Sequence, residues 1–211
     1  MLSWSEKNTI RLIVSMHVAG LLGFVLAPEY FVPLTAFNLI FGSYLVLRQP
    51  LIKKEISITP LLLLLLCGFA IEVAGVKTGL LFGEYQYGKA FGIKFLEVPV
   101  LIGLNWAMLI FCSSTLLKKF KFKPITTSFL VALLLTGIDF FIEQTAMKYD
   151  FWYWKNGIVP IQNYLAWFVV SFFLTFFFQS KINCEHKKYS VVYLLCQLVF
   201  FIGLYINKII F

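Results

Sequence analysis

The stretch "ITPLLLLLLCGFAIEVAGVKTGLLFGEYQYG", residues 58–88, decides how this chain folds. Its first part, 58–76, is almost entirely apolar and has the length of a helix that crosses a bilayer. One acidic residue, Glu72, interrupts this run, and a glycine-flanked segment with two tyrosines follows it. An ionisable group in hydrocarbon costs at least about 2.5 kcal/mol, so Glu72 needs a functional or structural reason to be there.

The whole chain has the composition of a polytopic membrane protein. Of its 211 residues, 60% are hydrophobic and only 13% are charged, whereas soluble domains carry about 25% charged residues. We predict an all-α helical bundle of about seven transmembrane helices, which forms a single integral membrane domain over residues 1–211. Besides 58–76, the candidate spans are 9–27, 29–47, 96–117, 125–147, 161–179 and 189–207.

Lysine and arginine predict the orientation of this bundle. The N-terminal segment and the second, fourth and sixth connections hold 12 of the 18 basic residues, and the other side holds six. The positive-inside rule therefore predicts a multi-pass protein of the inner (plasma) membrane with its N-terminus in the cytoplasm. Because this clustering and anionic lipid account for the net charge of +8, we expect no nucleic-acid partner.

The acidic residues have the opposite distribution. Seven of the ten lie on the predicted outer side, and four of these, Glu72, Glu97, Asp139 and Glu143, fall within or at the edge of a span. Asp139 and Glu143 are four residues apart, so both project from one face of the same helix. Two close carboxyl groups in a low-dielectric site cannot easily both ionise, and one is expected to stay protonated near neutral pH. Such a pair suits general acid catalysis; the alternative is a structural pair bonded to backbone or to Lys148.

Aromatic and amide side chains accompany these acids on the same predicted side. Electron-rich rings beside carboxylic acids suit a reaction that passes through a cation. The alternative for the rings is an interfacial aromatic belt, and for the amides it is packing between helices. The candidate catalytic residues are Asp139, Glu143 and Glu72, and the candidate substrate-binding residues are Tyr85, Tyr87, Glu84, Asn105, Trp106, Trp152, Trp154, Asn163 and Trp167.

Several kinds of site lack their characteristic residues in this chain. The two histidines, His17 and His186, are too few for a membrane di-iron centre. Only two aspartates occur, so there is no paired aspartate-rich motif to hold magnesium and pyrophosphate. No dinucleotide fingerprint or P-loop is present, and no cysteine pair has metal-ligand spacing. We therefore predict no metal site and no cofactor.

Short motifs occur in a fixed order between about residues 71 and 167. They are Glu72-x-x-Gly75-x-x-Thr78-Gly79, Phe82-Gly83-x-Tyr85-x-Tyr87-Gly88, Val98-Pro99, Asn105-Trp106, Asp139 with an acid four residues on, Trp152-x-Trp154, and Gly157-Ile158-x-Pro160-x-x-Asn163-x-x-x-Trp167. In this combination the chain resembles the membrane carotenoid-biosynthesis proteins, a family that includes CruF-type carotenoid 1,2-hydratases and bisanhydrobacterioruberin hydratase. Where that family usually has Asp then Pro, this chain has Glu143-Gln144.

The resemblance implies an activity that needs no metal and no redox cofactor. Water would add across the terminal C1=C2 bond of the acyclic (psi) end group of an acyclic or monocyclic carotenoid. Protonation at C2 gives a tertiary cation at C1, and water then attacks C1 to leave a tertiary alcohol. The implied partners are this carotenoid, water, the lipid bilayer and other carotenoid-pathway enzymes.

The resemblance also suggests roles for the candidate residues. Asp139 and Glu143 would supply the proton donor and its partner, and Glu72 competes as donor or as base for the water. The tyrosines and tryptophans would shield the cation, while Asn105 and Asn163 would position water or a carboxylate. Two alternatives stay open. One is a small membrane carotenoid (lycopene-type) cyclase, which uses the same cation, and the other is a non-catalytic transporter or lipid-binding protein.

Overall fold

The computed structural model describes residues 6–182 and 188–210. Glu185, His186 and Lys187, which enter the charge and metal arguments above, lie outside the described residues. Within the described ranges, seven helical segments are long and apolar enough to cross a membrane, which confirms the predicted all-α bundle. They are α1 (Glu6–Leu26), the continuous segment of α2 (Pro28–Phe31), η1 (Val32–Leu34) and α3 (Thr35–Ile52), α4 (Ile58–Thr78), α5 (Leu101–Lys118), α6 (Pro124–Ala146), α7 (Ile161–Phe178) and α8 (Lys188–Ile210).

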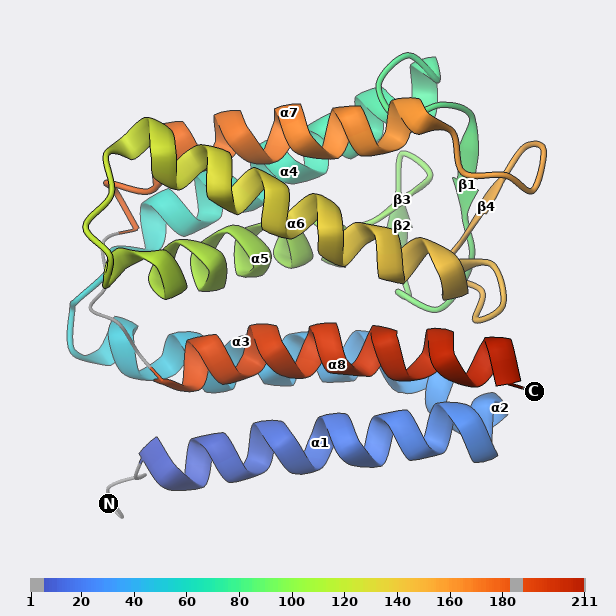
Figure 1. Cartoon of the computed structure of the whole chain (residues 1–211), viewed down its shortest axis with the longest axis horizontal. Helices are drawn as coiled ribbons and strands as arrows, with labels where there is room; N and C mark the ends of the chain where they lie inside the picture. Colours follow the sequence, from blue (N-terminus) through green and yellow to red (C-terminus); the bar gives the residue numbers. More distant parts are fainter. Residues whose placement is uncertain (1–5, 183–187, 211) are drawn as a thin grey trace.

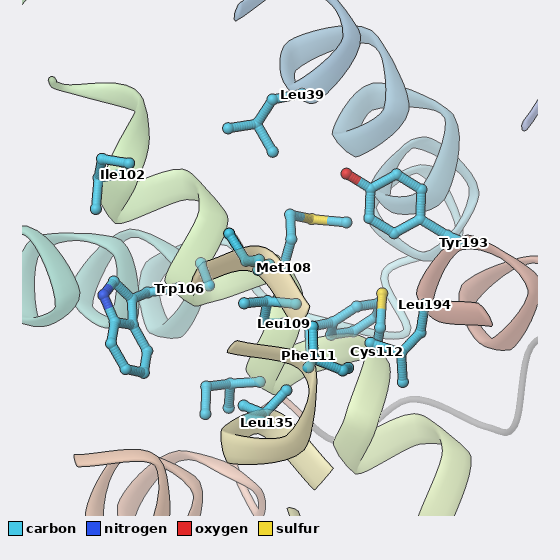
Figure 2. Close-up of a cluster of buried hydrophobic side chains, with 14 of the residues drawn as sticks. Leu39, Ile102, Trp106, Met108, Leu109, Phe111, Cys112, Leu135, Tyr193 and Leu194 are labelled. Atoms are coloured by element: carbon cyan, nitrogen blue, oxygen red, sulfur yellow. The ribbon is translucent and has the colours of Figure 1, made fainter. Parts of the chain in front are cut away.

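The helices form two groups with α5 at their junction. Helices α1, α3 and α8 lie on one side of the bundle and α4 to α7 on the other, and α1 begins at the opposite end of the bundle from the end of α8 (Figure 1). Helix α5 has the largest buried share of the seven, 61% of its apolar window. Its side chains meet Leu39 of α3, Leu135 of α6, and Tyr193 and Leu194 of α8 in one apolar cluster (Figure 2).

Four short strands at one end of the bundle were not predicted from the sequence. β1 (Tyr85–Tyr87) pairs antiparallel with β4 (Trp152–Trp154), and β2 (Lys94–Phe95) pairs antiparallel with β3 (Val98–Pro99). The β1–β4 pair joins the connection after α4 to the connection after α6 (Figure 1). It therefore brings together two segments that are far apart in the sequence.

The β2–β3 hairpin corrects the predicted fourth span. We expected that span to begin near residue 96, but α5 begins at Leu101 because the chain first turns through Leu96 and Glu97, both at positive φ. Glu97 consequently lies outside the spanning helix, where it is exposed and forms a salt bridge with Lys77 at 2.6 Å. Of the four acids considered, only Glu72, Asp139 and Glu143 therefore lie inside spanning helices, where an ionisable group is energetically unfavourable.

Candidate functional site

The β1–β4 pair covers the ends of α4 to α7 with aromatic side chains. Tyr85 lies opposite Trp154, and Tyr87 lies opposite Trp152. Side chains alternate between the two faces of a strand, so these four rings share the inner face. The intervening residues, Gln86 and Tyr153, are exposed. The alternation of aromatic and other residues in both short segments thus builds one aromatic wall.

Two glycines allow the chain to return over the helix ends. Gly79 ends α4 in the left-handed conformation, with φ of +66°, which a residue with a side chain adopts only at a cost. Gly88 lies so close to the partner segment that an added Cβ would be 2.1 Å from the backbone oxygen of Asp150. A side chain at residue 88 would therefore separate the connection after α4 from the connection after α6.

Glu72 projects from α4 beneath this aromatic wall. The buried residues of α4 are spaced three and four apart, so Glu72 lies on the helix face that packs into the bundle. Its Oε2 accepts hydrogen bonds from the phenols of Tyr85 and Tyr87, at 2.6 and 2.8 Å. Its Oε1 accepts one from Trp106 Nε1 of α5, at 2.8 Å. Three donors thus hold this buried carboxyl group in place.

Asp139 and Glu143 lie on one face of α6, as their spacing predicted. The Nδ2 atom of Asn163 in α7 donates to both, at 2.9 Å to Asp139 Oδ2 and at 3.1 Å to Glu143 Oε1. The indole nitrogens of Trp152 and Trp154 both donate to Glu143 Oε2, at 2.9 and 2.8 Å. Asp139 Oδ1 is buried and has no hydrogen-bond partner among the described residues.

A small cavity lies between the helices and the aromatic wall. Its volume is about 30 Å³, which is room for one or two waters. The indole rings of Trp106 and Trp167 stack with their centroids 4.2 Å apart and form part of its lining. The residues that line it are Glu72, Phe82, Tyr85, Tyr87, Ile102, Asn105, Trp106, Glu143, Trp152, Trp154, Asn163 and Trp167.

Two sequence candidates do not line this cavity, and two lining residues were missed. Asp139 is fully buried behind Asn163. Glu84 is exposed and forms a salt bridge with Lys155 at 2.5 Å. Phe82 and Ile102 line the cavity, but apolar side chains in an apolar sequence give no signal of such a role. The only sequence feature that could have indicated Phe82 is its place in the motif Phe82-Gly83-x-Tyr85-x-Tyr87-Gly88, which supplies two other lining residues.

The donors around the carboxyl groups are neutral. No lysine, arginine or histidine within residues 6–182 and 188–210 forms a salt bridge with Glu72, Asp139 or Glu143. Burial, followed by the nearby Glu72 charge, raises the pKa of the Tyr85 and Tyr87 phenols, so both stay protonated donors. In the same described ranges, no group of three histidine, cysteine, aspartate or glutamate side chains is arranged to hold a metal ion.

Comparison with known proteins identifies the family of this site. The model of the carotenoid biosynthesis protein family matches residues 32–211. The chain belongs to the carotenoid biosynthesis protein family. No curated protein and no solved structure matches the chain.

Membership in the carotenoid biosynthesis family gives the chain a role in making carotenoids, which are long apolar polyenes. The matched range contains every residue that lines the small cavity, whereas α1 precedes it. The seven apolar helices among the described residues fit a multi-pass membrane protein, and a protein in a membrane has access to lipid-soluble molecules of this kind.

Proposed function

We propose that the chain is a carotenoid 1,2-hydratase, which adds water to the terminal double bond of an acyclic end group. One observation carries this proposal. Two buried carboxyl groups, Glu72 and Glu143, line one small aromatic cavity, and a third, Asp139, lies directly behind it. Hydration of an isolated alkene needs a proton donor, protection of the cation and a base for the attacking water.

In this proposal Glu143 donates the proton. Its Oε1 has the Asn163 amide as a donor, while both indole N–H groups bind Oε2. The O–H bond of Glu143 breaks as a C–H bond forms at C2 of the alkene, which leaves a carboxylate on Glu143 and a tertiary cation at C1. The indoles of Trp152 and Trp154 then stabilise the new carboxylate, because hydrogen bonds to charged acceptors are stronger. Asp139 shares the Asn163 amide with Glu143 and acts as its partner.

The rings and the opposite carboxyl group complete the reaction. The end group reaches the edge of this cavity, whose own volume is left for water, and the rings that line it, such as those of Tyr85 and Trp106, stabilise the cation at C1. Water bound in the cavity attacks C1, and Glu72 accepts the proton that this water releases. A proton then returns from Glu72 to Glu143, which line the same cavity, and the net change is the addition of one water.

Space for water is what favours hydration over ring closure. A cyclase would use the same acid and cation but would need its cavity to exclude water. Here the cavity is large enough for water, and Asn105 and Asn163 contribute amide groups to its lining. Polar partners of this kind are what a buried water requires.

Co-expression in a host that accumulates lycopene or a monocyclic carotenoid tests the proposal. We expect a more polar pigment that is heavier by one water, and we expect Glu143→Gln and Asp139→Asn to abolish it while the protein still inserts. Chromatography with mass spectrometry reads out the product. An isomeric ring product would make the chain a cyclase. Unchanged pigment across several acyclic substrates, with the protein inserted, would favour a transporter or binding protein.

A further inference from the structure

A second and larger cavity lies on the other side of α5 and α6 from α4 and α7. Its volume is about 260 Å³, and most of its lining is apolar. Helices α1, α3 and α8 supply most of its wall. The lining residues are Met16, His17, Ala19, Gly20, Phe24, Phe31, Leu34, Thr35, Phe37, Asn38, Leu39, Phe91, Asn105, Ile142, Phe151, Trp152, Tyr193, Gln197, Phe200 and Phe201.

This cavity adjoins the acid site. Asn105 and Trp152 line both cavities. The indole nitrogen of Trp152 donates to Glu143, while its ring stacks on Phe91, a residue of the larger cavity, with centroids 6.4 Å apart. Ile142 lines the larger cavity and its neighbour Glu143 the smaller one. A molecule that fills the larger cavity therefore ends next to the proposed proton donor.

The larger cavity also reaches the outer surface of the bundle. Two of its lining residues on the α3 side are strongly exposed, Leu34 at 49% and Phe37 at 60%. Exposed apolar side chains on a membrane-spanning segment face lipid. Its volume lies just below the range for small-ligand pockets, about 300–1,000 Å³, so a long polyene would place only the part next to one end here.

We propose that this cavity binds the hydrocarbon chain next to the reacting end group, and that α1, α3 and α8 select which chain is accepted. The identity of the reacting end rests on the function proposed above. The occupant is an acyclic isoprenoid chain, because the wall is apolar, one end meets the acid site and the other meets lipid. Helix α1 lies before residues 32–211, the range that matches the family model. Part of the wall that selects the chain therefore lies outside the region shared with the family.

Gly20 of α1 offers a way to fill the cavity from within. An added Cβ would have its nearest neighbours at 3.5 Å, on Phe200, and at 3.9 Å, on Asn38, which are ordinary contacts. Because Gly20 itself lines the cavity, Gly20→Leu adds a side chain whose first carbon fits at the helix and whose remaining carbons reduce the space of the cavity. Gly137 of α6 provides a matched control, because an added Cβ there meets nothing within 4 Å.

The test measures retained pigment and turnover separately. The wild-type chain and the variants G20L, G20A, G137L and E143Q are purified after growth with lycopene, and bound pigment per protein is read by absorbance. We expect wild type, G137L and E143Q to retain pigment. We expect G20L to retain about tenfold less and to raise KM by a similar factor. G20A, which adds one carbon, should give a smaller loss in the same direction and provides the test if G20L does not insert.

The outcomes separate this proposal from the hydratase proposal. Equal retention and equal KM for G20L and G137L would overturn the chain-binding role, even if hydration occurs. Absence of pigment from wild type, or phospholipid acyl chains as the ligand that G20L displaces, would overturn it too. Retention that depends on residue 20, without any hydrated product, would support the cavity and reject the hydratase.

Discussion

Removal of one indole N–H group from Glu143 tests the proposed acid directly. In Trp154→Phe the ring is kept, so the packing against Tyr85, with centroids 5.1 Å apart, is largely preserved. The hydrogen bond from Nε1 to Glu143 Oε2, at 2.8 Å, is lost. A hydrogen bond to a charged group contributes about 1.5–3 kcal/mol. If Glu143 becomes a carboxylate in the transition state, that loss lowers kcat by about 10- to 150-fold.

The lower part of this range is expected because Trp152 still donates to the same oxygen, at 2.9 Å. The assay measures initial rates of hydrated product with the purified protein in lipid nanodiscs, using chromatography. KM should change little, because Trp154 does not line the larger cavity. The drop should therefore appear in kcat.

Tyr153→Phe is the matched control for this variant. Tyr153 lies between the two tryptophans on β4, and its hydroxyl donates to Asp150 Oδ1 at 2.9 Å on the exposed face. The Tyr153→Phe variant, like Trp154→Phe, loses one hydrogen bond to a carboxylate, but this bond lies outside the site. Surface changes usually stay within about 0.5 kcal/mol, so its kcat should remain within about twofold of wild type. A Trp154→Phe enzyme with kcat within that margin, or a Tyr153→Phe enzyme that falls equally, would refute the role of Glu143 as acid.

Three further outcomes follow from the contacts around the site. Tyr87→Phe removes a donor to Glu72 at 2.8 Å and should lower the free energy of unfolding by about 1–3 kcal/mol, measured by thermal unfolding in detergent. Burial and the Glu72 charge raise the pKa of Tyr87, so its stabilising effect is complete below the ordinary tyrosine value of about 10 and is lost at higher pH. The unfolding midpoint of wild type should therefore fall more steeply with alkaline pH than that of Tyr87→Phe. Gly88→Ala should cost about 1–3 kcal/mol through the clash with Asp150, whereas Gly137→Ala, inside a helix and free of clashes, should not lower the unfolding midpoint in the same melt.

The helices were predictable because each membrane-spanning helix requires a run of about 20 mostly apolar residues, which is visible in the sequence. Apolar length alone gave the sixth span as 161–179, and α7 occupies Ile161–Phe178. The fourth span failed at its start, since Phe95, Leu96, Val98 and Val100 are as apolar as a helix while forming a hairpin and its flanks. Hydropathy counts apolar residues and cannot tell a helix from an apolar hairpin at its end.

The site was partly predictable for a different reason. The spacing of Asp139 and Glu143 fixes a shared helix face, so their proximity followed from the sequence. The pairing of Tyr85 with Trp154 did not, because three-residue strands carry too few residues for a periodic signal. The exposed position of Glu84 follows from the same pairing. The larger cavity had no signal at all, because its lining consists mainly of ordinary apolar residues.

The hydrogen-bond donors around Glu72 and Glu143 are all neutral, which suits a reaction that passes through a carbocation. Buried carboxylates are commonly stabilised by lysine or arginine, but a positive side chain would repel a carbocation formed a few ångströms away. Here indole N–H, phenol O–H and amide N–H groups bind Glu72 and Glu143 instead. These neutral donors stabilise negative charge on the oxygens, while the same tyrosine and tryptophan side chains line the cavity with electron-rich rings. One set of side chains can thus stabilise the carboxylate and the cation in the same step, which no arrangement of lysines or arginines would achieve.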